Sequence, residues 1–123
     1  MSLIETTRQH DVVTLALNRP EKRNALSPDL IAAMHSALDV VESDASIRVL
    51  ILGGLGKCFC AGMDLRGVLD DSAAMGEMLR ELARATVRLR ALPVPTIARV
   101  HGAAIGGGCG LAAVTDLAVT HPE

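Results

Sequence analysis

Aromatic residues are almost absent from this chain of 123 residues. Phe59 is the only one, because tryptophan and tyrosine do not occur. Stacking of aromatic rings on nucleic-acid bases is therefore excluded as a mode of binding. An excess of one charge is lacking too, since 12 lysines and arginines against 14 acidic residues give a formal net charge of −2. Such a chain creates no strong field for a polyanion or an anionic membrane, so we expect neither nucleic acid nor a membrane as partner.

Long apolar runs, targeting signals and paired cysteines are also lacking. The N-terminal stretch MSLIETTRQH turns polar at once, and no apolar run approaches the length of a membrane span, so a cytoplasmic protein is expected. The three cysteines, Cys58, Cys60 and Cys109, are an odd number and lack the two spaced pairs of a zinc site. They are predicted to be reduced, buried side chains, and no metal site is expected.

What the chain does contain is an alternation of strand and helix patterns. Residues 3–17 predict a hairpin around a polar break at 9–11, because Val13, Leu15 and Leu17 alternate after it. Further along, the patterns predict helices over 28–42 and 75–92, strands over 48–53, 96–100 and 116–120, and a mobile loop over 68–76. This order predicts the α/β class, with a largely parallel sheet in a single domain over residues 1–123.

Glycine is dense after the predicted strand 96–100. The glycines are Gly102, Gly106, Gly107, Gly108 and Gly110. A phosphate-binding Walker loop would need a lysine and a hydroxyl residue where Gly108 and Cys109 stand. A dinucleotide fingerprint fails as well, because Leu111 takes the place of its third glycine. Two alternatives are left: a glycine turn that leads into a helix and holds an anion on free N–H groups, or close packing of strand against helix without a ligand.

A second glycine-rich segment follows the end of the predicted strand 48–53. It runs from Gly53 to Gly56 and continues into the segment from Cys58 to Leu65. Two glycine-rich segments after strand ends expose backbone N–H groups. These groups can converge on one oxygen atom if the two strands are neighbours in the sheet. They would then stabilise a negative charge on that oxygen. At the level of the sequence this convergence is a hypothesis.

Three stretches of the chain also occur in a distinctive order. They are NRPEKRNALS at 18–27, FCAGMDL at 59–65 and HGAAIGGGCGLA at 101–112. Together they resemble the enoyl-CoA hydratase/isomerase, or crotonase, superfamily, over what corresponds to the N-terminal half of its domain. The resemblance implies a crotonase-like superhelix of ββα units, truncated before its C-terminal helical part, with residues 1–123 as a partial acyl-CoA-binding domain. It also implies an acyl-CoA substrate, no cofactor beyond the coenzyme A of that substrate, and a homotrimer or hexamer.

The resemblance further implies roles for individual residues. The backbone N–H groups of Met63 and Gly107 would form an oxyanion hole for the thioester carbonyl. Gly107 would stand at the start of a helix, whose dipole favours the same negative charge. The contacts with the adenine and pantetheine of coenzyme A would fall on Arg23, Ala25, Ala61, Asp64 and Leu65. Arg23, or Lys22 beside it, would meet phosphate groups of coenzyme A.

The sequence departs from the family pattern at the acid and base. Hydratases of this family use two glutamates, the first of them three residues after the middle glycine, and here Gly110 stands at that position. Glycine transfers no proton, so hydration by two glutamates is not supported. The second acid is expected beyond Glu123. The other acids, Asp64, Asp70, Asp71 and Asp116, are expected to be structural or solvated, and His101 to be a strand-end residue and not a base.

Three functions are left open by these residues. The first is an acyl-CoA enzyme of the enoyl-CoA hydratase/isomerase type, in which a backbone oxyanion hole stabilises a thioester enolate. The second is a catalytically incompetent CoA-binding fragment or paralogue that lacks the acid/base glutamates. The third, a nucleotide-binding α/β module of another family, is disfavoured by the missing phosphate-loop residues. The three ordered stretches favour the first.

Overall fold

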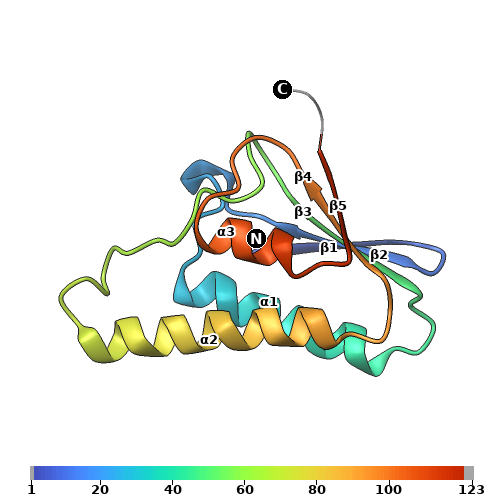
Figure 1. The fold of residues 1–123 in the computed structure, drawn as a ribbon, viewed down its shortest axis with the longest axis horizontal. Coiled ribbons are helices and arrows are strands. Elements are labelled where there is room, and N and C mark those ends of the chain that lie inside the picture. Colours follow the sequence, from blue (N-terminus) through green and yellow to red (C-terminus); the bar gives the residue numbers. More distant parts are fainter. Residues whose placement is uncertain (1, 121–123) are drawn as a thin grey trace.

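Strands and helices alternate along the chain, as the hydrophobic pattern predicts (Figure 1). The computed structural model describes residues 2–120. The strands are β1 (Ile4–Gln9), β2 (Val12–Leu17), β3 (Val49–Gly54), β4 (Thr96–Val100) and β5 (Leu117–Thr120). The helices are the short 3-10 turn η1 (Pro20–Lys22), α1 (Pro28–Ser43), α2 (Ser72–Ala91) and α3 (Gly107–Ala113). Within this described part, no helix has the length and apolar character to cross a membrane.

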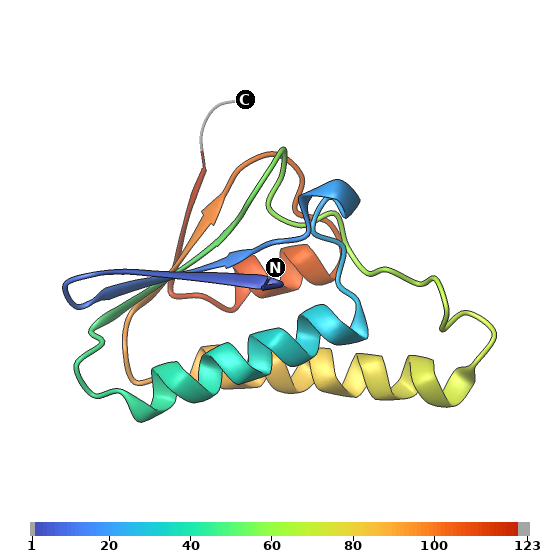
Figure 2. The same ribbon diagram turned by 180° about the vertical axis from the view of Figure 1, so that it is seen from behind.

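The five strands form one sheet whose order is the order of the chain, β1-β2-β3-β4-β5. β1 is antiparallel to β2, and the remaining neighbours are parallel. Leu15 of β2 lies opposite Leu52 of β3, which lies opposite Ala98 of β4, and all three are buried. In both views α1 and α2 lie together on one side of the sheet (Figure 1, Figure 2). The predicted α/β class with a largely parallel sheet is confirmed.

Helix α1 begins where the local sequence predicts. Oγ of Ser27 accepts a hydrogen bond from the N–H of Leu30 at 3.2 Å, and Pro28 takes the first helical position, where its missing N–H is of no consequence. The buried residues of α1 are Leu30, Ile31, Met34, Leu38 and Val41, and those of α2 are Met78, Leu82, Ala85 and Leu89. With the strand leucines and Phe59 they make an almost wholly aliphatic core.

The mobile loop predicted over 68–76 is wrong in its second half. Helix α2 begins within it at Ser72. The carboxylate of Asp71 caps the helix by accepting a hydrogen bond from the N–H of Ala74 at 3.0 Å. The start was missed because the apolar period of α2 becomes clear only after this first turn.

The cysteines differ in exposure. Cys58 and Cys60 are buried, as predicted, whereas Cys109 is exposed, so the prediction for Cys109 is wrong. The reason is the helical period of α3: its buried residues, Gly108 and Leu111, lie on one side, and Cys109 projects on the other.

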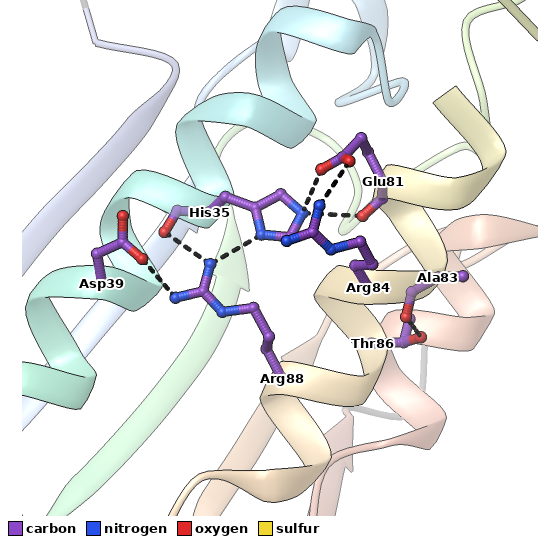
Figure 3. Close-up of polar contacts among 7 residues, drawn as sticks. All are labelled: His35, Asp39, Glu81, Ala83, Arg84, Thr86 and Arg88. Carbon is purple, nitrogen blue, oxygen red and sulfur yellow. Dashed lines mark hydrogen bonds and ion pairs between the residues drawn. The ribbon is translucent and has the colours of Figure 1, made fainter. Parts of the chain in front are cut away.

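Polar side chains join α1 to α2 (Figure 3). Arg88 of α2 approaches Nδ1 of His35 at 2.9 Å, donates to Asp39 at 2.6 Å and also pairs with Glu42. Because arginine is only a donor, Nδ1 of His35 accepts, and Nε2 carries the proton that it shares with the carbonyl oxygen of Glu81, 2.9 Å away. These contacts hold the two helices side by side.

Candidate active site

The three motifs of the sequence meet at one edge of the sheet. We define the first motif as residues 18–27, the second as 59–65 and the third as 101–112. They follow β2, β3 and β4, which are neighbouring parallel strands, so the carboxyl ends of these strands lie at the same edge. The second motif runs between the other two and is joined to each of them by backbone hydrogen bonds.

A short parallel bridge joins the second motif to the first. The N–H of Leu26 donates to the carbonyl oxygen of Gly62, and the N–H of Asp64 donates to the carbonyl oxygen of Leu26, both at 2.8 Å. This pairing sets Leu26 opposite Met63. The backbone around Met63 is therefore held from the side of the first motif.

The third motif packs on the second through backbone contacts. The N–H of Phe59 donates to the carbonyl oxygen of His101 at 2.7 Å, and the N–H of Ile105 donates to that of Cys60 at 3.0 Å. A Cβ atom at Gly108 would lie only 2.5 Å from the carbonyl oxygen of Cys60. Close approach of two backbones thus explains part of the glycine density in the third motif.

The direction of the Met63 N–H follows from its peptide bond. The carbonyl of Gly62 and the N–H of Met63 belong to one trans peptide, so they point in opposite directions. The carbonyl faces Leu26, and the N–H therefore faces away from the first motif. On Gly62, a Cβ would lie 3.4 Å from the carbonyl oxygen of Ile105, which places the third motif close by. Among residues 2–120 the Met63 N–H has no hydrogen-bond acceptor.

Gly107 brings a second N–H to the same region. It is the first residue of α3, so its N–H has no acceptor within the helix, and the rest of the described chain supplies none. A Cβ at Gly107 would lie 3.6 Å from Cγ of Met63 and 2.9 Å from Cδ1 of Leu26. The sequence predicts that the two glycine-rich segments after strands 48–53 and 96–100 come together. The structure brings Met63 and Gly107 into proximity. Two N–H groups of this kind can stabilise negative charge on an oxygen that both of them reach.

The residues that the resemblance assigns to coenzyme A lie where the first and second motifs join. Arg23 is exposed at the end of η1, and its carbonyl oxygen accepts a hydrogen bond from the N–H of Ala61 at 3.0 Å. Ala25 is half-buried, and Leu65 is exposed. An open surface cleft beside them is lined by Pro20, Glu21, Arg23, Gly56 and Lys57.

Asp64, also assigned to coenzyme A, turns its carboxylate toward two arginines of the chain. Its Oδ2 lies 2.8 Å from Nη2 of Arg19 and 2.8 Å from Nη2 of Arg66. Hydrogen bonds from Arg66 and Arg19 hold the pKa of this carboxyl far below its usual range. At neutral pH Asp64 is therefore an anion whose charge is compensated within the protein.

Asn24 is a residue of this region that sequence reasoning missed. It is fully buried, and its Nδ2 donates to the carbonyl oxygens of Leu55, Cys58 and Phe59 at 2.9, 3.0 and 3.1 Å. Its Oδ1 accepts a hydrogen bond from the N–H of Arg19 at 2.8 Å. A φ of 57° places it in the left-handed region, which asparagine tolerates better than most residues. An uncharged polar residue directly after a charged run was the signal that could have found it.

The position of the first family glutamate is open in the structure. Gly110 lies one helical turn after Gly107, and a Cβ there would meet no described atom within 4 Å apart from its chain neighbours and the nearby backbone of α3. Asp116 is structural, as predicted, because its Oδ2 accepts a hydrogen bond from the N–H of Thr96 at 2.9 Å. His101 is occupied at Nε2, which lies 2.8 Å from the carbonyl oxygen of Gly56. Within residues 2–120, no three His, Cys, Asp or Glu side chains are grouped so that they could hold a metal ion.

Comparison with known proteins decides the family. The sequence pattern of the enoyl-CoA hydratase/isomerase family matches residues 7–123. The chain belongs to this family. An enoyl-CoA hydratase structure from Mycobacterium smegmatis superposes with a TM-score of 0.90 at 39% identity, covering 96% of this chain and 47% of that one. One from Bacillus anthracis gives a TM-score of 0.90 at 30% identity, covering 96% of this chain and 47% of that one. The crotonase-like fold is thereby confirmed.

Relatives with named substrates belong to the same group. The hydroxycinnamoyl-CoA hydratase-lyase of Pseudomonas fluorescens is 39% identical over 118 residues, which are 91% of this chain and 43% of that protein. The 2,3-dehydroadipyl-CoA hydratase of Escherichia coli is 37% identical over 121 residues, 97% of this chain and 46% of that protein. The chain thus spans about half the length of the curated relatives it matches.

Proposed function

We propose that this protein binds acyl-CoA thioesters in the manner of the enoyl-CoA hydratase/isomerase enzymes. The observation that carries the proposal is the pair of N–H groups on Met63 and Gly107, which lie where the second and third motifs meet and have no acceptor among residues 2–120. The carbonyl oxygen of a thioester is an acceptor suited to such a pair. It gains negative charge when the carbon next to the carbonyl loses a proton and an enolate forms. Donors directed at that oxygen stabilise the charge as it develops.

Each donor acts mainly on the state in which the oxygen is charged. Removing one such N–H from an oxyanion hole typically slows the reaction by about 10²–10³-fold. Side-chain identity at position 63 is nearly free in this scheme, because the backbone supplies the donor. Gly107, in contrast, faces Leu26 and Leu82, so its lack of a side chain also serves packing.

Coenzyme A is recognised next to the first motif in this proposal. Arg23, with Lys22 beside it, meets the phosphate groups, for which the exposed guanidinium is suited. Ala25, Ala61, Asp64 and Leu65 flank the adenine and pantetheine. The coenzyme A is part of the substrate, and no separate cofactor is invoked.

A second function, CoA binding without turnover, is favoured by one observation. Gly110 stands where the family's hydratases use a glutamate, and the space beside it holds no side chain of the described residues. Asp64, Asp71 and Asp116 do not replace it, because each is held in structural hydrogen bonds or ion pairs. We therefore expect acyl-CoA binding to be retained more readily than turnover.

The proposal also concerns the identity of the acyl group and the oligomeric state of the protein. The names of the relatives range from hydroxycinnamoyl-CoA to 2,3-dehydroadipyl-CoA, so we propose the CoA thioester itself as the element that is recognised. A homotrimer or hexamer and a cytoplasmic location stay predictions, and light scattering on the purified protein measures the first of them.

Calorimetry and a hydration assay test the proposal together. We expect butyryl-CoA to bind more tightly than free coenzyme A, because only the thioester offers a carbonyl oxygen to the two N–H groups. We expect slow or undetectable loss of the absorbance of crotonyl-CoA. Failure to bind butyryl-CoA would refute the proposed function, and rapid hydration of crotonyl-CoA would show that this chain carries a catalytic base.

A further inference from the structure

Asp64, Arg19 and Arg66 form a group of charged side chains directly beside Met63, which we call the Asp64 cluster. Nη2 of Arg19 lies 2.8 Å from Oδ2 of Asp64, and its Nη1 donates to the carbonyl oxygen of Ala25 at 3.0 Å. Arg66 donates hydrogen bonds to both carboxylate oxygens of Asp64, from Nε to Oδ1 at 2.9 Å and from Nη2 to Oδ2 at 2.8 Å. One carboxylate is thus shared by two guanidinium groups.

The two arginines differ in burial. Their side chains are 17% exposed for Arg19 and 63% for Arg66, against 9% for Asp64. Arg66 makes more contacts with Asp64, since its N–H also donates to Oδ1 at 3.1 Å, but it lies two residues away in the same segment and its guanidinium is screened by water. The pair with Arg19 is largely shielded, and breaking it would leave a carboxylate without its buried partner. Arg19 is therefore the residue that ties the Asp64 side chain to the first motif.

Asp64 is tied to the first motif at two points. Its N–H donates to the carbonyl oxygen of Leu26 at 2.8 Å, and its carboxylate pairs with Arg19. On the other side of Met63, the carbonyl oxygen of Gly62 accepts from the N–H of Leu26 at 2.8 Å. The Met63 backbone is therefore clamped on both sides, and its N–H cannot turn without the loss of one of these contacts.

We propose that Arg19 and Asp64 are a positioning pair for the thioester site, whose ion pair holds the Met63 N–H in the direction in which it donates to the thioester oxygen. The inference rests on the proposed function, since it takes that N–H as a donor to the oxygen. The pair has a second effect: Arg19 compensates a carboxylate that would otherwise oppose negative charge on a nearby oxygen. In this scheme neither side chain touches the thioester carbonyl.

The test measures how much the carbonyl oxygen of the ligand contributes to binding. Dissociation constants are determined by calorimetry for butyryl-CoA and for its thioether analogue, butyl-CoA, which lacks that oxygen. Their ratio, thioether over thioester, is the carbonyl discrimination. Difference infrared spectra of butyryl-CoA with a 13C-labelled carbonyl give the stretching frequency of the bound carbonyl. Wild type is compared with Asp64→Asn, Arg19→Lys and the exposed control Arg66→Met, and melting temperatures confirm that each variant is folded.

In the wild type we expect the thioester to bind more tightly than the thioether, and its carbonyl band to shift to lower frequency. Asp64→Asn and Arg19→Lys should reduce the discrimination by about 2- to 10-fold, the worth of one hydrogen bond to that oxygen. They should also move the band back toward its frequency in water. Affinity for the thioether reports the contacts with coenzyme A, which the resemblance also assigns to Asp64. It should stay close to wild type in the two arginine variants, and any change in it at Asp64→Asn cancels in the ratio. A general loss of structure would weaken both ligands equally and would not single out the carbonyl.

Three outcomes overturn one proposal or the other, and they are distinguishable. A wild-type protein that binds both ligands equally and leaves the carbonyl band unshifted lacks the oxyanion donors, and the proposed function fails. If the wild type distinguishes the thioester from the thioether and Asp64→Asn and Arg19→Lys do so equally well, the proposed function stands. The positioning pair is then overturned. Equal losses for Arg66→Met and Arg19→Lys would also overturn it, because the exposed charge would then act as strongly as the buried one.

Discussion

Asn24 is a buried amide that serves four backbone groups. Three are carbonyl oxygens between Leu55 and Phe59, and the fourth is the N–H of Arg19. Buried polar groups that lose their partners each cost free energy on the order of 1–3 kcal/mol. Because the groups belong to the first motif and to the turn that enters the second, this one side chain holds the two segments together.

We predict that Asn24→Ala lowers the free energy of unfolding by about 3 kcal/mol or more, since several buried groups lose their partner at once. Asn24→Gly removes the same hydrogen bonds but adopts the left-handed backbone without strain, so it should be less damaging by about 1–2 kcal/mol. Urea unfolding of the three proteins measures both differences.

The matched control for Asn24 is Asn18→Ala. The amide of Asn18 makes one exposed hydrogen bond, to the carbonyl oxygen of Ser2 at 2.8 Å. Its removal should cost about 1 kcal/mol or less. Equal losses at positions 18 and 24 would contradict the central role given to Asn24.

The pKa of Asp64 allows a prediction of how the free energy of unfolding responds to acid. Its pairing with Arg66 and Arg19 depresses the pKa of the carboxyl in the folded protein. A depressed carboxyl pKa contributes stability that is fully present above the unfolded value, near 3.9, and is lost as the pH falls below it. The stability difference between wild type and Asp64→Asn should therefore be larger at neutral pH than in acid well below that value. Urea unfolding at the two pH values measures it, with Asp70→Asn as the exposed control; a difference that grows in acid would contradict the argument.

The glycines of α3 serve different purposes, although they look alike in the sequence. A Cβ at Gly108 would meet the carbonyl oxygen of Cys60 at 2.5 Å and its Cβ at 2.7 Å, and this backbone cannot move aside. The Cβ of a residue at Gly107 would meet only the ends of the Leu26 and Leu82 side chains, at 2.9 and 3.1 Å, which can shift. At Gly110 it would meet no described atom within 4 Å apart from its chain neighbours and the nearby backbone of α3.

We predict opposite effects for alanine at two of these positions. Gly108→Ala should destabilise the protein by about 1–3 kcal/mol, the usual cost of overpacking, because α3 must move away from the second motif. Gly110→Ala should be neutral or stabilise by up to about 1 kcal/mol, since alanine favours the helix and space is open. Thermal unfolding of the two variants decides the matter, and a stable Gly108→Ala protein would contradict the packing described for α3.

The contacts of Arg88 join α1 to α2, and this pairing is also open to test. Its side chain is 22% exposed and bonds His35, Asp39 and Glu42. We predict that Arg88→Met lowers the free energy of unfolding by roughly 1–2 kcal/mol, because the His35 ring and two carboxylates lose a shared donor. Urea unfolding measures the loss.

Arg80→Met is the control on the same helix. Arg80 is 68% exposed and pairs with Glu77 within α2, so its loss should cost no more than about 0.5 kcal/mol. If the two arginine variants are equally stable, the network in Figure 3 contributes nothing to the joining of the helices.

For the whole molecule, the order of the strands is what assembles the site. Each strand joins the sheet beside the one before it, so β2, β3 and β4 are parallel neighbours. The motifs that follow them therefore lie at one edge, although 31 residues separate the first from the second and 35 the second from the third along the chain. The second motif becomes the centre of the site because β3 is the central strand of the three.

The local sequence determined the elements and their order. A serine cap and a proline predict the start of α1, and alternating apolar residues predict β2. Such patterns depend on neighbours along the chain, which is why they can be interpreted without a structure. The resemblance of three short motifs likewise indicated the family, and the comparisons confirmed it.

Only the tertiary structure decided which of these residues meet. Periodicity shows that a strand exists but not which strand lies beside it, so the proximity of Met63 and Gly107 was a hypothesis until the strand order was known. The same holds for the bonds of Asn24 to three carbonyl oxygens and for the pairing of Arg19 with Asp64, because these partners lie 31 to 45 residues away. These contacts depend on how separate segments pack against one another, and no local pattern encodes that packing.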